Sequence, residues 1–257
     1  MPSGTLRRLV LTLVLAVMAA GVAGCGGSGG GIFKQEFEYE EEIVLSLDGS
    51  ATVTVNASVP ALVALRGFNL DVNPRARVDR QQVRALFSAP GVDVNSVSLS
   101  RRHRRRFVHV SLDVADVRRL PAVAPFAWST YRLDHRGGIV AFQQVVGRAA
   151  GRTVSGVDWK GDEQVRFRVH VPSRIANNNS PEPVQRGNIL EWDQSLADRL
   201  RSVPLDLQID MEPKSILYST LLLFGGTIIA AAITFTAVLW WVARRGRDAD
   251  TVETTNA

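Results

Sequence analysis

The stretch Ile43–Ala57 reads IVLSLDGSATVTVNA, and it indicates the fold of the central part of the chain. Apolar and polar residues alternate on both sides of Asp48–Gly49, as in strands that bury one face. Asp-Gly between two such runs is a strong hairpin signal, because both residues tolerate the positive φ angles of a tight turn. The stretch therefore predicts two antiparallel strands joined by a short turn.

The same alternation recurs at Val108–Val114, Val165–Val171 and Leu205–Met211. A change of phase at Asn95–Ser96 predicts a β-bulge. Residues 134–138 read as a turn between two further strands. Apolar-in, polar-out strands of this kind form antiparallel sheets with one solvated face.

Helical patterns are short and begin near Pro60, Asp79 and Ser195, each with capping or stop residues. Residues 177–187, rich in asparagine and proline, read as a surface loop. Many strands with a few short helices predict an α+β fold, mostly antiparallel β, for residues 32–213.

The acidic run Glu36–Glu42 alternates in part with Phe37 and Tyr39. Charged residues protect the edge strands of sheets from pairing with other chains. We therefore expect an edge strand here; the alternative is that the run opposes a basic run farther along the chain.

Residues 1–24 have the features of a secretory signal. Arg7 and Arg8 precede an apolar run that is too short to span a bilayer comfortably, which takes about 20 residues. Val22–Cys25 resembles the bacterial lipobox, and the resemblance implies cleavage before Cys25 and a diacylglycerol on its sulfur. The alternative is an ordinary signal peptide with a chance cysteine, although Cys25 is the only cysteine in the chain.

A second anchor is expected at residues 216–243, which carry no charge. A helix of about 28 residues is about 42 Å long, more than the roughly 30 Å hydrocarbon core of a bilayer. Arg244, Arg245 and Arg247 follow, and positive charge marks the cytoplasmic side. We therefore predict a single transmembrane helix with an extracytoplasmic domain before it and an irregular cytoplasmic tail at 244–257. Gly226 and Ala230 make a weak case for self-association of this helix.

The two anchors limit how far the domain can lie from the membrane. Residues 25–31 are the lipidated cysteine and a glycine-rich tether, whose six flexible residues reach roughly 13–15 Å. We therefore expect both ends of the folded domain to lie close to the outer leaflet of the cytoplasmic membrane. Residues 32–215 carry 25 basic and 22 acidic side chains, an ordinary balance that argues against a nucleic-acid partner.

Residues for catalysis are sparse. The four histidines, His103, His109, His135 and His170, are scattered and form no metal-binding spacing. We expect no catalytic residue, no metal and no cofactor, and hence no enzyme, while a serine–histidine arrangement formed only in space stays open.

A basic run lies between two strand patterns and includes Arg101, Arg102, Arg104, Arg105 and Arg106. We favour a solvated hairpin turn, because surface arginines are common and weakly informative. The alternative is contact with anionic lipid headgroups, which contributes about 1 kcal/mol for each basic residue near a charged surface.

Lipobox, glycine tether, β-rich domain and terminal span together resemble the LppM-type envelope lipoproteins of mycobacteria. Residues 187–192 (GNILEW) are similar in character to that family's C-terminal strand. The resemblance implies a mixed α/β domain that contacts lipid or another apolar ligand. We therefore predict an envelope lipoprotein that binds a lipid or other amphiphile in an apolar cavity; the alternative is a scaffold that recruits an envelope protein through an exposed apolar patch.

Overall fold

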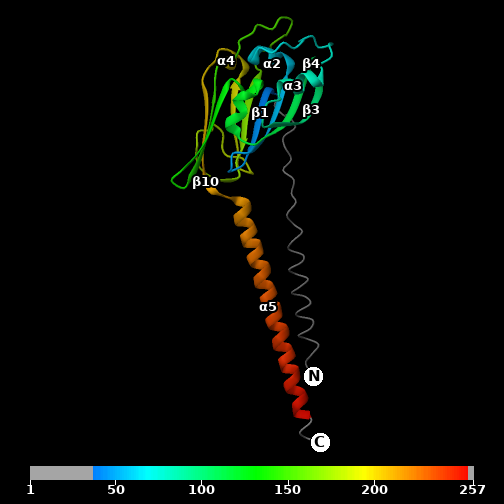
Figure 1. The fold of residues 1–257 in the computed structure, drawn as a ribbon, viewed down its shortest axis with the longest axis vertical. Helices are drawn as coiled ribbons and strands as arrows, with labels where there is room; N and C mark the ends of the chain where they lie inside the picture. Colours follow the sequence, from blue (N-terminus) through cyan, green and yellow to red (C-terminus); the bar gives the residue numbers. More distant parts are fainter. Residues whose placement is uncertain (1–36, 254–257) are drawn as a thin grey trace. The chain divides into compact units, whose positions relative to one another are not determined.

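The computed structural model describes residues 37–253, which form a β-rich domain that continues into one long helix (Figure 1). Sheet A has six strands in the order β3-β4-β2-β1-β7-β9, and sheet B has four, β5-β6-β10-β8. The strands pair antiparallel, except that β1 and β7 are parallel. Their bounds are β1 Phe37–Leu45, β2 Ala51–Ser58, β3 Val92–Arg102, β4 Arg105–Val114, β5 Ser129–Arg136, β6 Ile139–Val146, β7 Gln164–His170, β8 Ser173–Asn178, β9 Ile189–Ser195 and β10 Leu205–Ser215.

Short helices connect some of these strands, and α5 ends the chain that the structure describes. The helices are α2 Val59–Arg66, α3 Arg80–Leu86, the 3-10 helices η1 Val117–Ala122 and η2 Ala124–Phe126, α4 Leu196–Leu200 and α5 Ile216–Glu253. The α+β fold with mostly antiparallel strands is confirmed.

Local sequence chemistry explains many of the boundaries. The β1–β2 turn forms at Asp48–Gly49 as predicted, with Gly49 at φ +92° and the Asp48 carboxylate accepting from the Ser50 amide at 2.9 Å. The pairing of β3 with β4 shifts register between Val94 and Ser96, which is the predicted bulge. The predicted loop 177–187 begins later, because Asn177 and Asn178 still belong to β8.

The helix starts are also confirmed. Ser58, Asp79 and Ser195 each cap a helix by accepting a backbone hydrogen bond in its first turn, which satisfies a donor that the helix itself leaves free. Helix α2 ends at Gly67, whose φ of +72° suits a residue without a side chain.

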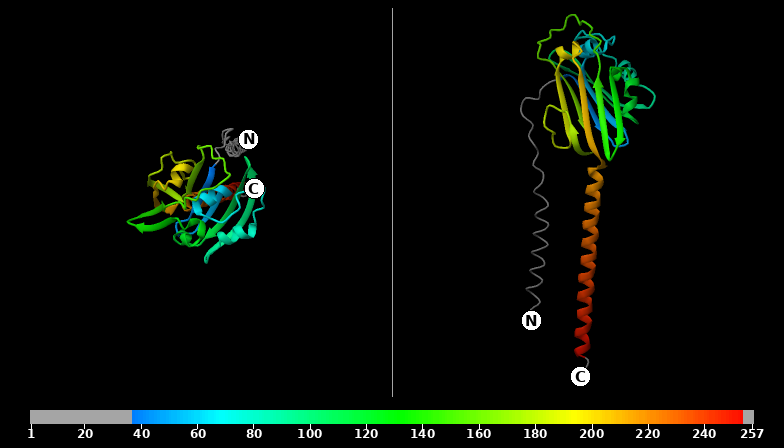
Figure 2. Two further views of the ribbon diagram at one scale, coloured as in Figure 1. Left: turned by 90° about the horizontal axis from the view of Figure 1, so that it is seen from above. Right: turned by 90° about the vertical axis from the view of Figure 1, so that its left-hand side faces the viewer.

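The core lies between the two sheets, which face each other in Figure 2. Tyr39 on β1 packs edge-on against Trp128 just before β5, with ring centroids 5.6 Å apart. Phe167 on β7 and Phe142 on β6 are almost fully buried in the same cluster. Burial of each such side chain stabilises the fold by about 1.5–3 kcal/mol relative to exposure.

Strand β1 is not an edge strand, so the interpretation of the acidic run was wrong. It lies between β2 and β7 in the middle of sheet A. The run tolerates this position because Glu40 and Glu42 face basic groups of β7, with Glu42 Oε1 2.6 Å from His170 Nε2. Glu42 and its partner His170 lie 128 residues apart in the sequence, so the acidic run considered alone suggests an edge strand.

The two ends of the folded domain lie at opposite ends of its strands. Tyr39 pairs with Ala57, at the end of sheet A where β2 enters α2. Ser215 pairs with Ser173, three residues beyond His170, and His170 pairs with Val44 at the other end of β1. The end at Phe37 therefore lies about the length of β1 away from the end at which α5 begins, a separation that the sequence did not indicate.

Helix α5 is long and apolar enough to cross a membrane, with a candidate span at Thr220–Trp241. None of the residues in its apolar window is buried by the rest of the domain. The helix continues to Glu253, so residues 244–253, expected to be irregular, are helical. Arginine and alanine favour helix in this segment.

Candidate functional site: an arginine-lined cleft

The basic run forms the tip of the β3–β4 hairpin. Arg101 pairs with Arg106 and Arg102 with Arg105, and His103 and Arg104 form the turn with φ of 45° and 62°. Since directly opposite residues share a face of the sheet and neighbours alternate, the run is divided between the two faces. Arg101 and Arg106 lie on the core side, and Arg102 and Arg105 lie on the outer side.

Arg105, one of the predicted headgroup contacts, is largely buried and contacts other parts of the domain. Its guanidinium forms ion pairs with Glu38 and with Glu163, the latter at 3.0 Å, and stacks 4.7 Å from the ring centre of Trp159. These contacts join β4 to β1 and to the segment before β7. The guanidinium and backbone amides also hold the pKa of Glu163 below its ordinary value, against the opposing effect of burial.

Arg106 is also turned inward and is only 7% exposed. It donates to the backbone carbonyls of Asp71 and Ala76, the latter at 2.8 Å, so it holds the loop before α3 against β4. Its Nε is buried without a hydrogen-bond partner in the part of the chain that the structure describes. Burial lowers the pKa of Arg106, with nearby Arg101 adding to the effect. Arg101, Arg102 and Arg104 remain as the exposed members of the predicted set.

The loop and the hairpin together form an open cleft of about 510 Å³. Arg75 and Arg77 line it from the loop, and Arg101 and Arg106 line it from the hairpin. Half-buried Val78 and Leu99 give it an apolar floor. Among residues 37–253, no carboxylate forms an ion pair with Arg75, Arg77 or Arg101, so these three guanidinium groups carry uncompensated positive charge, while Asp71 lies near Arg106.

Guanidinium groups bind carboxylate and phosphate through two parallel hydrogen bonds. A cleft with several of them and a partly apolar floor suits an acidic group attached to an apolar or sugar portion. The sequence did not indicate Arg75 and Arg77, because they are separated from the hairpin by α3 and most of β3. Strand alternation alone could have separated Arg101 and Arg106 from their neighbours.

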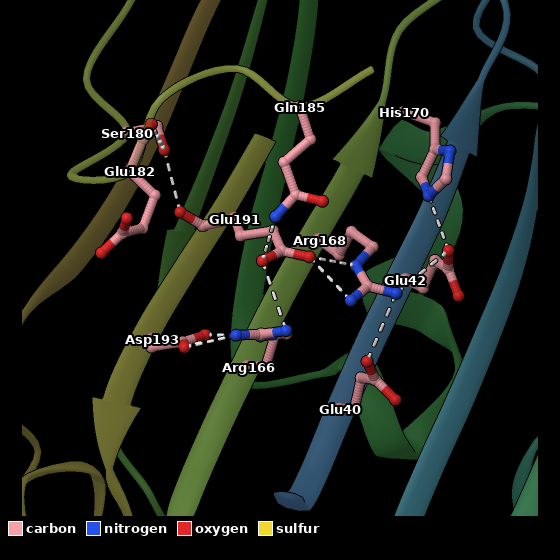
Figure 3. A network of polar contacts seen from close by, with 10 residues as sticks. All are labelled: Glu40, Glu42, Arg166, Arg168, His170, Ser180, Glu182, Gln185, Glu191 and Asp193. Carbon is pink, nitrogen blue, oxygen red and sulfur yellow. Dashed lines mark hydrogen bonds and ion pairs between the residues drawn. The ribbon is translucent and has the colours of Figure 1, made fainter. Parts of the chain in front are cut away.

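The outer face of sheet A is polar for a different reason, shown in Figure 3. Arg166 Nε donates to Asp193 at 2.7 Å, and Arg168 Nε donates to Glu191 at 2.7 Å. His170 bonds Glu42 and holds the pKa of that carboxyl below its ordinary value. Each of these basic side chains has an acidic partner, so this face should bind an anion more weakly than the cleft does.

A serine–histidine arrangement does form on this outer face. Asn56 Nδ2 donates to Glu40 at 3.1 Å, which leaves its Oδ1 to accept from His109 Nδ1 at 2.8 Å. His109 Nε2 then accepts from Ser100 Oγ at 2.7 Å. Burial lowers the pKa of His109, which favours the neutral ring.

Ser100 also lines the cleft, but its hydroxyl lies with His109 on the outer face of sheet A. Ser100 pairs with Phe107 and Ser98 with His109, whereas Leu99 shares the core-side face with Val108. The hydroxyl of Ser100 therefore points away from the cleft arginines, and its network links β3, β4, β2 and β1. The absence of an enzymatic role stays a prediction.

A buried carboxylate lies between the two sheets. Glu41 is 1% exposed and accepts hydrogen bonds from Tyr39, Tyr131 and Gln144 at 2.7–2.9 Å. Burial raises the pKa of Glu41, while these three donors and nearby Arg66 oppose the rise. The cluster ties β1 to β5 and β6, and it affects stability rather than ligand binding.

Several predicted features lie outside the described residues, namely the signal sequence, Cys25 and the tether. Large exposed apolar side chains of the domain are Val44, Ile139, Val145, Val184 and Val203. They include no aromatic residue, and the scaffold alternative stays a prediction.

Comparison with known proteins places the chain near one solved structure. No protein-family model matches the chain, and no curated protein does. The solution structure of the folded domain of LppM from Mycobacterium tuberculosis is similar to it, with 13% identity and a TM-score of 0.41. The match covers 72% of this chain and 95% of that domain. The resemblance drawn from the sequence is thus found again as a weak architectural one.

Proposed function

We propose that this chain is a membrane-anchored envelope protein that binds an anionic amphiphile, with the acidic group held in the arginine-lined cleft. The observation that supports the proposal is the set of unpaired guanidinium groups of Arg75, Arg77 and Arg101 around a partly apolar floor. Elsewhere in the domain, arginines such as Arg105, Arg166 and Arg168 are paired with carboxylates. The cleft gathers several unpaired guanidinium groups close together, so one acidic group of a ligand can pair with more than one of them.

The membrane location rests on the span in α5 and on the basic residues that follow it. Arg244, Arg245 and Arg247 support a cytoplasmic C-terminus, because positive charge beside a span favours the cytoplasmic side. The β-rich domain then lies on the extracytoplasmic side, with Cys25 as a second, lipid-bearing anchor.

The open basic cleft takes the place of the apolar cavity in which the sequence predicted that a lipid or other amphiphile binds. Thirty-nine largely buried apolar side chains form the core cluster of the domain, and the cleft described above is open and basic. We therefore assign recognition to the acidic headgroup, while Val78 and Leu99 contact the adjoining carbon skeleton.

Binding of a short-chain phospholipid tests this function directly. The full chain in zwitterionic nanodiscs is titrated with dihexanoyl phosphatidylglycerol and, separately, with dihexanoyl phosphatidylcholine. We expect the anionic lipid to bind more tightly, and the double change Arg75→Gln/Arg77→Gln to weaken it roughly 30-fold, because two lost charge contacts of about 1 kcal/mol each amount to about 2 kcal/mol.

The matched control is the double change Arg132→Gln/Arg148→Gln, which removes the same charge at exposed positions outside the cleft. It should leave the affinity for the anionic lipid almost unchanged. Equal affinity for the two lipids, or equal weakening by the two double changes, would contradict the proposed function.

A further inference from the structure

The position of the cleft within the domain restricts the class of ligand. We infer that the ligand is an amphiphile whose acidic group stands well outside the bilayer, such as an acidic glycolipid with an extended headgroup, rather than an ordinary phospholipid in the membrane. This inference rests on the proposed function and names the ligand class of the same cleft.

One end of the domain is held at the membrane by chain length. Strand β10 pairs with β8 as far as Ser215, and α5 begins at the next residue (Figure 1). Only residues 216–219 separate that pairing from the candidate span at Thr220–Trp241. Four helical residues rise about 6 Å, so the Ser215 end of the sheets lies next to the bilayer surface.

The side chains at that end suit contact with a bilayer surface. Ile139 is 42% exposed beside the β5–β6 turn, and Val44 is 48% exposed where β1 pairs with His170. Exposed Arg136 and Arg174 lie at the same end, near the β5–β6 turn and the start of β8, where they form surface ion pairs with Asp134 and Glu212. Apolar and basic side chains together favour the membrane–water interface.

The cleft lies at the other end of the strands. In β4, Arg106 lines the cleft and Val114 pairs with Ala51 at the membrane end of sheet A. Eight residue steps of about 3.3 Å separate Arg106 from Val114, or roughly 26 Å. The phosphate of a phospholipid lies in the headgroup layer, only about 5–8 Å beyond the hydrocarbon core.

A phospholipid could reach the cleft only by leaving the bilayer. Exposure of two acyl chains of about 15 methylene groups each costs roughly 24 kcal/mol at 0.8 kcal/mol per group. The floor formed by Val78 and Leu99 is too small to replace that burial. A lipid with a long headgroup carries its acidic group to the cleft while its acyl chains stay in the membrane.

A series of spacers tests the inference. The full chain is reconstituted in nanodiscs that contain lipids with a carboxylate at the end of a poly(ethylene glycol) spacer, with reaches from about 5 to about 50 Å. Displacement of a soluble fluorescent short-chain phosphatidylglycerol from the cleft is the readout. Methoxy-terminated spacers are the control for the spacer itself, and Arg75→Gln/Arg77→Gln is the control for the cleft.

We expect displacement to rise at least tenfold once the spacer exceeds roughly 26 Å, and phosphatidylglycerol in the bilayer to be ineffective at equal surface density. Displacement by bilayer phosphatidylglycerol as strong as that by long spacers would overturn the inference and leave the proposed function intact. If the short-chain probe itself does not bind, the proposed function fails, and the inference fails with it.

Discussion

The buried carboxylate of Glu41 predicts the direction in which the stability of the domain changes with pH. Burial raises the pKa of Glu41 above its ordinary value of 4.5. The folded state therefore holds this proton more tightly than the unfolded state does. The stabilisation is fully present below pH 4.5 and is lost as the pH rises through the folded-state pKa.

The change Glu41→Gln removes the ionisation and nearly keeps the shape. Its amide oxygen still accepts two of the three hydrogen bonds from Tyr39, Tyr131 and Gln144, so we expect a pH-independent cost of about 1 kcal/mol for the third donor. The native chain should lose stability relative to the variant by about 1.4 kcal/mol for each unit of raised pKa as the pH increases.

The assay is urea unfolding of the full chain in detergent, followed by near-ultraviolet circular dichroism between pH 4 and pH 8. The variant-minus-native difference removes the contributions of the other carboxyl groups. Glu182→Gln, a change at an exposed glutamate, is the matched control and should keep the native slope. Parallel pH curves for the native chain and Glu41→Gln would refute the assignment of a raised pKa to Glu41.

Three further changes test the fold and the anchors. Arg105→Ala should destabilise the domain by about 2–4 kcal/mol in the same unfolding assay, because Glu38 and Glu163 lose their partner in a largely buried site; a loss below about 0.5 kcal/mol would show that this pairing is only superficial. Gly147→Ala should destabilise by about 2 kcal/mol or more, since its Cβ would lie 2.5 Å from the Trp128 carbonyl oxygen. Gly137→Ala has open space around it but a φ of +56°, so it should cost only about 1 kcal/mol for the left-handed backbone. Deletion of Gly26–Gly31 leaves six residue steps between Cys25 and Phe37, about 21 Å when fully extended, which is shorter than the roughly 26 Å from Phe37 to Leu45 along β1. Amide exchange in β1 should therefore rise in the lipidated chain but not in the chain that also carries Cys25→Ser. Equal exchange in both chains would show that the two anchors do not strain the domain.

Local features of the fold could be predicted well from the sequence. The Asp48–Gly49 turn, the bulge near Asn95 and the helix caps at Asp79 and Ser195 each depend on residues within a few positions of one another. Their energies are decided by backbone geometry and nearby hydrogen bonds, which a short window of sequence contains.

Features that depend on distant partners could not be predicted. The acidic residues of β1 indicated an edge strand, because Arg168 and His170 become their neighbours only through the parallel pairing of β1 with β7. The cleft required Arg75 and Arg77 from a loop to meet Arg101 and Arg106 from a hairpin. The run 101–106 also seemed a single basic tip. In the structure, strand alternation divides its side chains between the two faces of sheet A, and Arg105 pairs with Glu38 and Glu163.

The measurement that tests the central claim most directly is hydrogen–deuterium exchange of the full chain in nanodiscs, with and without dihexanoyl phosphatidylglycerol. The account predicts slower exchange in residues 75–78 and 99–106, and no change with the phosphatidylcholine analogue. Protection confined to the membrane end of the domain, around residues 136–140 and 173–175, or none in the domain, would contradict ligand binding by the arginine-lined cleft.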